Sequence, residues 1–172
     1  MKPDLKIIAE FVSEADLLFR EIRSTTIWDE RMKSRKTASY GVSYDYSGIS
    51  YPETRMPQKL EEICSNIKNV IGFSPNNCLM NYYLDGSSKM GFHSDSSEEL
   101  SPNSGVVIIS LGSERDIAYR KIGNKDIKVR YSLKPGSLLY MTDELQQEWQ
   151  HAIPVHKGVG ERISLTFRHI LK

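Results

Sequence analysis

Three short segments of the chain carry side chains that could bind a metal ion and a carboxylate. His93 and Asp95 stand two residues apart, and His151 follows much later. Two imidazoles and one carboxylate on one face of a metal leave the opposite positions open for a co-substrate and dioxygen, as in mononuclear iron(II) oxygenases. Near the end of the chain stand Arg162 and Arg168, and a guanidinium can hold a carboxylate through two parallel hydrogen bonds. These residue types predict an iron oxygenase with a carboxylate co-substrate.

The histidine–aspartate pair is a weak signal by itself. A His-x-Asp sequence occurs by chance in many proteins, and His156 and His169 show that histidine also occurs here without such neighbours. On an extended strand, residues two apart point to the same face, so His93 and Asp95 would share a face. His151 would then come from a distant strand folded beside theirs. The signal becomes strong only with the arginine segment.

The arginine segment alternates in polarity, as a β-strand does. One predicted face carries Arg162, Ser164, Thr166 and Arg168, and the other carries Ile163, Leu165 and Phe167. In isolation, the pattern favours a strand at the protein surface, with its charged face in solvent and its apolar face packed on the core. Six residues span about 20 Å along a strand. Both arginines could therefore bind one small dicarboxylate only if their side chains converge. Otherwise one of them supports the metal-binding residues without touching the co-substrate.

Length and composition are those of one soluble globular domain. The chain has 172 residues, of which 39% are hydrophobic and 26% are charged. No apolar run reaches the length of a membrane span, and the N-terminus has no apolar signal core. Cys64 and Cys78 form neither a disulfide framework nor a zinc spacing, which favours a reducing cytoplasm. The net charge of +1 excludes a strong global field for a polyanion.

The first half of the chain predicts two amphipathic helices. The first begins at Ser13, where Asp16 completes a capping-box-like signal. The second runs from about Pro57 to Ile71, and Gly72 can end it. Between them lies a basic, tyrosine-rich stretch, residues 31–51.

After Pro75 the pattern changes to short apolar or alternating runs separated by turn residues. The predicted strands are Cys78–Leu84, Gly105–Leu111, Asp116–Arg120, Ile127–Leu133, Ser137–Met141 and Glu161–Ile170. Many short strands after two helices predict a mainly β (α+β) fold, a β-sandwich or jelly roll with two N-terminal helices packed outside. We expect one domain over residues 1–172, with a helical region at 1–75 and a jelly-roll core at 76–172.

The chain resembles the AlkB family of iron(II)- and 2-oxoglutarate-dependent dioxygenases, and most of all its short bacterial and animal nucleic-acid-repair branches. The resemblance runs from about residue 35 to residue 170. It is carried, in chain order, by Ser39-Tyr40-Gly41, Tyr46-Ser47-Gly48, Asn81-Tyr82-Tyr83-Leu84-Asp85-Gly86, Met90-Gly91-Phe92-His93-Ser94-Asp95, Ser110-Leu111-Gly112, Trp149-Gln150-His151-Ala152-Ile153-Pro154 and residues 160–168. The ordered set is far more specific than any of its parts.

The resemblance implies Fe(II), 2-oxoglutarate as co-substrate, and O2. The residues implied to bind iron are His93, Asp95 and His151. Arg162 is implied to hold the distal carboxylate of 2-oxoglutarate, with Tyr83 as a hydrogen-bond partner. Arg168 and Asn81 would lie near the carboxylate beside the keto group. Ser164 stands where many relatives have asparagine and would make a weaker version of that contact. The implied fold is a double-stranded β-helix.

In the resembled family the N-terminal region forms a nucleotide-recognition lid, which would place residues 31–51 beside the active site. The candidate substrate residues there are Arg35, Tyr40 and Tyr46. The tyrosines could stack on a base or order the co-substrate pocket, because aromatic rings interleaved with cations are typical of single-strand binding. They could equally be half-buried packing residues on a hairpin.

The chain departs from the family on the substrate side. Many repair relatives have an acidic residue directly after the aspartate ligand, where this chain has Ser96, our fourth candidate substrate residue. A carboxylate there would favour a cationic methylated base. Val155 stands where relatives often have lysine. The missing carboxylate counts against demethylation of cationic lesions, and the two departures together leave the substrate open.

The expected function is oxidative N-demethylation of alkylated nucleobases in DNA or RNA, as in DNA repair. The alternative is hydroxylation of a free nucleotide or a biosynthetic small molecule, which the near-neutral charge and Ser96 favour slightly. A catalytically silent nucleic-acid-binding module is a third candidate, but the intact metal and arginine residues count against it. A sugar-binding jelly roll without iron leaves the arginine strand unexplained. We expect a cytoplasmic monomer with an alkylated nucleic acid or nucleotide as substrate, and with no membrane contact or obligate protein partner.

Overall fold

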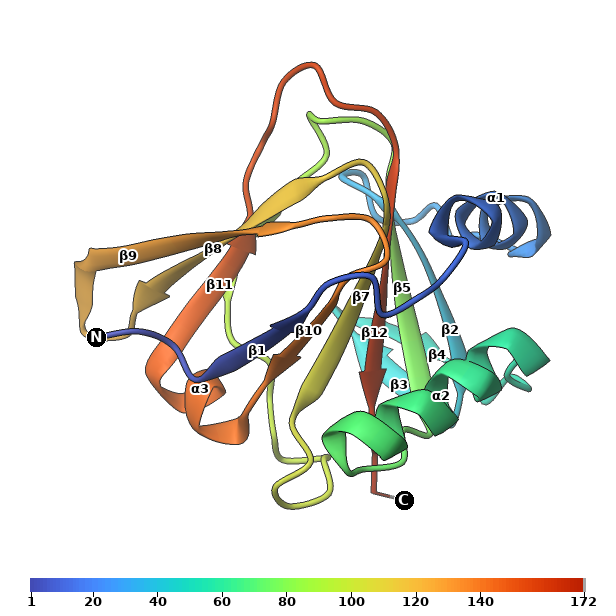
Figure 1. The fold of residues 1–172 in the computed structure, drawn as a ribbon, viewed down its shortest axis with the longest axis horizontal. Coiled ribbons are helices and arrows are strands. Elements are labelled where there is room, and N and C mark those ends of the chain that lie inside the picture. Colours follow the sequence, from blue (N-terminus) through green and yellow to red (C-terminus); the bar gives the residue numbers. More distant parts are fainter. Residues whose placement is uncertain (172) are drawn as a thin grey trace.

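Two antiparallel sheets pack face to face, with helices on the outer side of the larger one (Figure 1). The computed structural model describes residues 1–171. The larger sheet contains, in spatial order, β1 (Leu5–Ile8), β10 (Leu138–Met141), β7 (Val106–Gly112), β12 (Arg162–Arg168), β5 (Asn77–Tyr83) and β2 (Lys36–Gly41). The smaller sheet contains β6 (Met90–His93), β11 (Trp149–Ile153), β8 (Arg115–Lys121) and β9 (Asn124–Leu133). A separate hairpin consists of β3 (Tyr44–Tyr46) and β4 (Ile49–Tyr51).

The predicted jelly roll with helices outside is confirmed. All six predicted strands are present, with ends that differ by at most three residues. The strands outside the six predicted ranges are β1, β2, β3, β4, β6 and β11, of which β6 and β11 had been expected only as the strands that carry His93 and His151. Because β1 and β2 belong to the larger sheet, residues 1–75 supply two strands of the sandwich as well as two helices.

The helices are α1 (Ala15–Thr25), α2 (Gln58–Ile71) and a short α3 (Asp143–Glu148). The prediction for α2 is confirmed, with Pro57 at its N-terminal cap and Gly72 at its C-terminal cap with φ 107°. The predicted start of α1 at Ser13 was wrong. The helix begins at Ala15, after Glu14, whose φ of 52° is left-handed, and no side chain among residues 1–171 caps it. The capping box therefore does not form.

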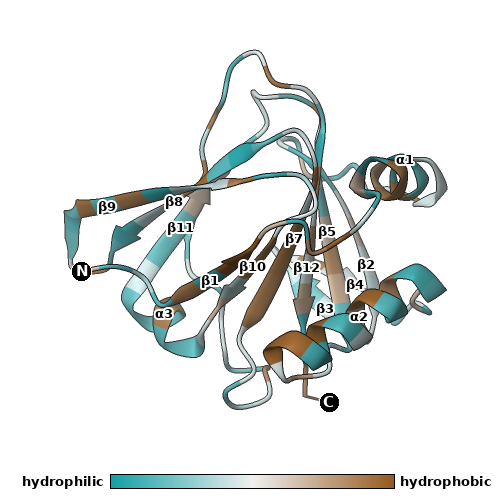
Figure 2. Cartoon of the chain, in the orientation of Figure 1, coloured by the Kyte–Doolittle hydropathy of each residue, from teal (hydrophilic) through white to brown (hydrophobic). Residues whose placement is uncertain are grey.

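The hydrophobic core lies between the two long helices and the larger sheet. Leu18, Phe19 and Ile22 of α1 and Leu60, Ile63 and Ile67 of α2 contact the outer face of the sheet. Figure 2 shows hydrophobic residues concentrated on β7, β10 and β5 of this sheet. Burial of this face stabilises the fold at roughly 25 cal/mol per Å² of apolar surface. Truncation of one buried leucine or isoleucine here would cost about 2–5 kcal/mol.

Strand β12 lies at the centre of the larger sheet, between β7 and β5, and all seven of its residues are buried. Ile163, Leu165 and Phe167 belong to the core under the helices, so the predicted alternation is correct. The alternative of a solvated charged face is wrong, because both neighbouring strands and the opposite sheet cover the strand. The polar face of β12 therefore points into the space between the sheets.

Among the residues that the structure describes, no helix combines the length and the apolar character that crossing a membrane requires.

Candidate metal and co-substrate site

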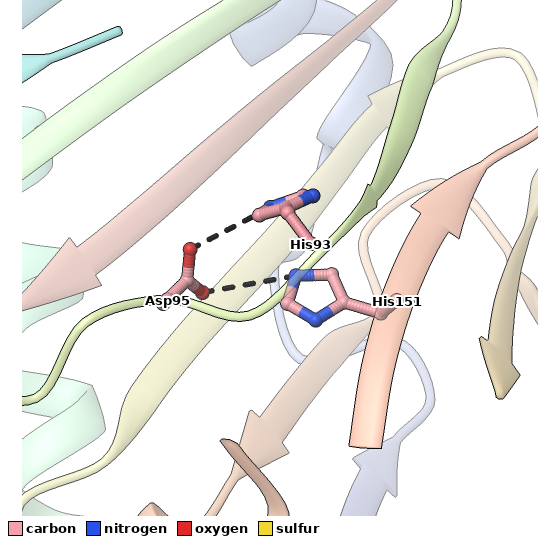
Figure 3. Close-up of side chains that lie close together, drawn as sticks. All are labelled: His93, Asp95 and His151. Carbon is pink, nitrogen blue, oxygen red and sulfur yellow. Dashed lines mark ion pairs between the residues drawn. The ribbon is translucent and has the colours of Figure 1, made fainter. Parts of the chain in front are cut away.

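The three predicted metal-binding residues converge between the two sheets (Figure 3). Their potential ligand atoms all lie within 4.8 Å of one another. Asp95 lies between the imidazoles, with Oδ1 3.6 Å from Nε2 of His93 and Oδ2 3.7 Å from Nε2 of His151. Two nitrogen donors and one carboxylate in this arrangement form the facial donor set that suits a non-haem iron ion.

Strand pairing positions the two histidines. His93 is the last residue of β6 and lies directly opposite His151 of β11 in the antiparallel register. This confirms the expectation that a distant strand folds beside the first. The expectation that Asp95 shares this strand was wrong. It lies in the loop after β6, since the strand ends at His93.

Both imidazoles can present Nε2 to a metal. Nδ1 of His93 lies 2.8 Å from the Gly91 carbonyl oxygen. Donation there leaves Nε2 as an unprotonated ligand atom. Burial lowers the pKa of His151 to about 4, so its ring is neutral at physiological pH and its lone pair is free. Burial also acts to lower the pKa of His93, but the hydrogen bond and charge of Asp95 outweigh it and raise that pKa.

Asp95 is held as a carboxylate by its neighbours. Burial acts to raise its pKa, but the Arg168 guanidinium and the two imidazoles outweigh it and hold the pKa well below its usual range. Nη2 of Arg168 lies 3.4 Å from Oδ1 of Asp95. The site therefore offers a carboxylate between two imidazoles, which a divalent cation binds once both rings present a lone pair.

Arg162 is a buried cation with donors left over. Its side chain is 1% exposed, and Nη2 donates to Ser110 Oγ at 2.9 Å. Nε and Nη1 have no hydrogen-bond partner within residues 1–171. Burial lowers the pKa of Arg162, which reflects the cost of a charge with too few acceptors. A carboxylate guest would supply the missing acceptors.

Arg168 has the same character at the other end of β12. It is 3% exposed, and in the described part of the chain its Nε and Nη1 have no partner. Arg162, Ser164, Thr166 and Arg168 line one cavity together with the three metal-binding candidates. The two arginines therefore converge on one cavity, as a small dicarboxylate would require.

Asn81 and Tyr83 of β5 complete this wall. In the antiparallel register Tyr83 lies opposite Arg162, and Asn81 lies opposite Ser164. The Arg162 guanidinium carbon lies 5.1 Å from the centre of the Tyr83 ring. Arg35 donates from Nε to Asn81 Oδ1 at 2.8 Å, which leaves the amide nitrogen of Asn81 as a donor. The five predicted co-substrate residues therefore all line the cavity.

The hairpin β3–β4 lies against this cavity. Tyr46 lines it, and its hydroxyl accepts a hydrogen bond from Nη2 of Arg35 at 2.8 Å. The guanidinium carbon of Arg168 lies 5.0 Å from the centre of the Tyr44 ring. The tyrosine-rich stretch is thus next to the site, and its aromatic rings pack on the arginines that surround the cavity.

Two of the four predicted substrate residues lie elsewhere. Tyr40 lies opposite Cys78 and packs against the core beneath the helices. The helices and the cavity lie on opposite faces of the larger sheet, and a strand side chain points to one face only. Because Tyr40 points toward the helices, it does not reach the cavity. Ser96 is exposed, and its hydroxyl accepts from the backbone N–H of Glu98 at 3.3 Å. Val155, the other departure from the family pattern, is 45% exposed.

Arg115 and Gln146 are polar residues near the site that the sequence patterns did not single out. Arg115 is fully buried, and its Nη2 donates to the carbonyl oxygens of Ser88 and Pro154, both at 2.7 Å. Gln146 is 6% exposed and contacts Asp95. Their only sequence signal is a polar residue within or beside an apolar segment, which many exposed residues share.

Comparisons with known proteins agree with this geometry. Residues 5–168 match the family described as the 2OG-Fe(II) oxygenase superfamily. The human protein named DNA oxidative demethylase ALKBH2 is 36% identical over 151 residues, which cover 80% of this chain and 57% of that protein. The mouse protein of the same name is 31% identical over 182 residues, with 92% of this chain and 76% of that protein covered. The chain therefore spans little more than half of the human relative and about three quarters of the mouse one.

A more distant relative and a solved structure extend this similarity. The rat protein named alpha-ketoglutarate-dependent dioxygenase alkB homolog 3 is 29% identical over 179 residues, which cover 92% of this chain and 61% of that protein. The solved structure described as "The structure of OsALKBH1" has a TM-score of 0.76 at 18% identity and covers 98% of this chain and 99% of that one. At this identity the match shows a shared fold.

Proposed function

Because this chain belongs to the 2OG-Fe(II) oxygenase superfamily, among its AlkB-like members, we propose that it oxidatively removes N-methyl groups from alkylated nucleobases in DNA or RNA. One observation carries the proposal. A His–Asp–His donor set and two buried guanidiniums with unused donors line the same cavity. A metal ion and a small dicarboxylate are the two guests that this combination requires.

The residues have distinct roles in the proposed site. His93, Asp95 and His151 bind Fe(II). Arg162, beside Tyr83, binds the distal carboxylate of 2-oxoglutarate, whereas Arg168 and the amide nitrogen of Asn81 face the carboxylate beside the keto group. Ser164 lies opposite Asn81 and offers a hydroxyl to the same end. Arg162 and Arg168 are both buried, which strengthens their charged contacts relative to contacts in water.

With O2 and 2-oxoglutarate bound, the Fe(II) site supplies oxidative decarboxylation coupled to insertion of one oxygen atom into a substrate C–H bond. The co-substrate loses carbon dioxide and becomes succinate. An N-methyl group becomes N-hydroxymethyl, whose C–N bond then breaks to release formaldehyde and return the proton to the base nitrogen. Each methyl group removed consumes one O2 and one 2-oxoglutarate.

The hairpin β3–β4 supports a planar substrate beside the metal. Tyr46 lines the cavity and is fixed by Arg35, so its ring is available for stacking on a base. A base within a duplex would have to be flipped out, or met in a single strand, to reach this depth. The enzyme would act as a single domain and a monomer, and the free thiols Cys64 and Cys78 support a reducing cytoplasmic compartment.

A free nucleotide or another small molecule is the second candidate substrate. Ser96 supports it, because the residue after the Asp95 ligand carries no carboxylate and uses its hydroxyl for a local turn. Compared with relatives that have an acidic residue at this position, the site therefore offers a cationic methylated base one charge-assisted partner fewer.

Mass spectrometry of methylated substrates tests the proposal. The protein is incubated with Fe(II), ascorbate and 2-oxoglutarate, and then with methylated oligonucleotides or with methylated nucleotides. The expected result is that each oligonucleotide loses the mass of one CH2 group per methyl group, and that succinate forms in step with this loss. Turnover of free nucleotides alone would support the second candidate. Succinate release that neither methylated oligonucleotides nor methylated nucleotides stimulate would contradict the proposal and leave a small molecule without a nucleobase.

A further inference from the structure

Asp95 is the one metal-binding candidate that no strand pairing positions. His93 and His151 lie opposite each other in the register of β6 and β11, so the backbone of the sheet sets their separation. Asp95 follows in the loop after β6. A carboxylate in a loop has more conformational freedom, and productive metal geometry requires that this freedom be removed.

Gln146 makes two hydrogen bonds to Asp95. Its Oε1 accepts from the backbone N–H of Asp95 at 2.9 Å, and its Nε2 donates to Oδ2 of the same residue at 3.3 Å. Only the oxygen of the amide can accept from an N–H, so the first bond places the nitrogen toward the carboxylate. One side chain thus fixes both the backbone and the side chain of Asp95.

The short helix α3 holds Gln146 in place. Thr142 caps the helix through Oγ1, which accepts from the backbone N–H of Leu145 at 3.2 Å. Leu145 is 1% exposed and anchors the turn in the core. Nε2 of Gln146 also lies 3.7 Å from the Met141 sulfur. The amide therefore projects from a packed element, which is how a supporting residue best fixes a ligand.

The same contacts join the loop of Asp95 to the segment that carries His151. Helix α3 leads directly into β11, and Ser94 Oγ donates to the Trp149 carbonyl oxygen at 2.7 Å. Gln146 and Ser94 together fasten the loop to the start of β11. The third ligand is thereby held relative to the second.

Gln146 and Arg168 contact different oxygens of Asp95. Gln146 donates to Oδ2, whereas Arg168 lies 3.4 Å from Oδ1. Without the amide, Oδ2 would lose its neutral donor and the backbone N–H of Asp95 would lose its acceptor, whereas the contact of Arg168 with Oδ1 would remain.

We propose that Gln146 is a positioning residue that orients Asp95 for metal binding. The inference rests on the proposed function, since it assumes that the His–Asp–His set binds a divalent metal. Hydrogen-bond partners of metal ligands typically change metal affinity by about 10- to 100-fold when they are removed. We expect an effect of that size from loss of the Gln146 amide.

Co(II) binding to the metal-free protein tests this inference. Gln146→Met keeps the length of the side chain and its apolar contacts but removes both hydrogen bonds. Gln146→Ala removes the side chain at a helical position and serves as the second variant. Gln147→Met is the matched control, because Gln147 is the exposed neighbour on the same helix. Titration calorimetry gives the affinity, the ligand-field absorption of Co(II) reports the coordination, and circular dichroism confirms folding.

The expected result is Co(II) binding weakened about 10- to 100-fold in both Gln146 variants, with an altered absorption spectrum and with Gln147→Met unchanged. A merely structural role would lower stability without changing the spectrum of the folded, loaded protein. Affinities within twofold of wild type and an unchanged spectrum in a folded Gln146 variant would overturn the inference alone. A wild-type protein that binds no Co(II) would overturn the metal centre of the proposed function, and this inference with it.

Discussion

Replacement of Arg162 by lysine keeps the positive charge but removes the planar fork of donors. The guanidinium is 1% exposed, and one of its nitrogens donates to Ser110 Oγ at 2.9 Å. Its Nε and Nη1 have no partner within the described chain. We assign the unused donors of this guanidinium to the distal carboxylate of 2-oxoglutarate. A lysine ammonium can reach the same region, but it cannot present two parallel donors.

The size of the effect follows from the number of bonds lost. A hydrogen bond to a charged group contributes about 1.5–3 kcal/mol, and the lysine variant loses one of two such bonds. At about 1.4 kcal/mol per factor of ten, the affinity for 2-oxoglutarate should fall by roughly tenfold to somewhat more than a hundredfold. The distal carboxylate is remote from the bonds that break, so kcat should change little. A raised KM with an unchanged kcat is the signature of lost uniform binding.

Succinate formation at varied 2-oxoglutarate concentration measures both constants for Arg162→Lys. Arg130→Lys is the matched control, because Arg130 is exposed on β9 and pairs with Asp116 at 3.6 Å. Binding of the unreactive analogue N-oxalylglycine to the Mn(II)-loaded protein gives an affinity that does not depend on turnover. An unchanged KM and an unchanged analogue affinity would remove Arg162 from the co-substrate pocket and refute the assignment.

Three further predictions concern metal binding, packing and the thiols. Individual replacement of His93, Asp95 or His151 by alanine should abolish Fe(II) binding and turnover while circular dichroism stays native; wild-type metal content in any variant would remove that residue from the ligand set. Gly86→Ala should destabilise the fold by about 1–3 kcal/mol or more in urea unfolding, since a Cβ there would lie 1.7 Å from the His156 carbonyl oxygen, whereas Gly91→Ala, with nothing within 4 Å, should be close to neutral; equal midpoints would contradict this packing. Burial raises the pKa of the Cys64 thiol to about 12, so at pH 8 roughly one thiol in ten thousand is ionised and Cys64 should react with Ellman's reagent only after unfolding; rapid reaction of the native protein would show that this thiol is accessible and ionised.

The alternation of β12 could be predicted, because the two-residue period of a strand depends only on the backbone. Its burial could not. Whether the face with Arg162 and Arg168 is solvated depends on the smaller sheet, whose strands come from other parts of the chain and lie across the cavity from β12. The resemblance to a known family, rather than the pattern, pointed to a buried site.

The ligand set could be predicted, but the way that Asp95 is held could not. Two-residue spacing suggested a shared strand for His93 and Asp95, yet β6 ends at His93. The partner that positions Asp95 is Gln146, 51 residues away in a six-residue helix that is too short for a periodic signal. Long-range side-chain contacts of this kind have no local pattern.

The tyrosines show the same limit at single-residue scale. Tyr40 and Tyr46 have similar sequence surroundings, but the strand period turns Tyr40 toward the helices, whereas Tyr46 lines the cavity. The start of α1 differs for a different reason, because the left-handed Glu14 replaces the expected cap at Ser13 and no sequence rule favours glutamate in that conformation.

Formaldehyde and succinate released from an oligonucleotide with a single 3-methylcytosine test the central claim most directly. Wild-type protein with Fe(II) and 2-oxoglutarate should release the two products in equal amounts, together with an unmethylated oligonucleotide, and Asp95→Ala should release neither above background. Succinate without formaldehyde, at a rate that no methylated oligonucleotide or nucleotide changes, would contradict the assignment of this site to nucleobase demethylation.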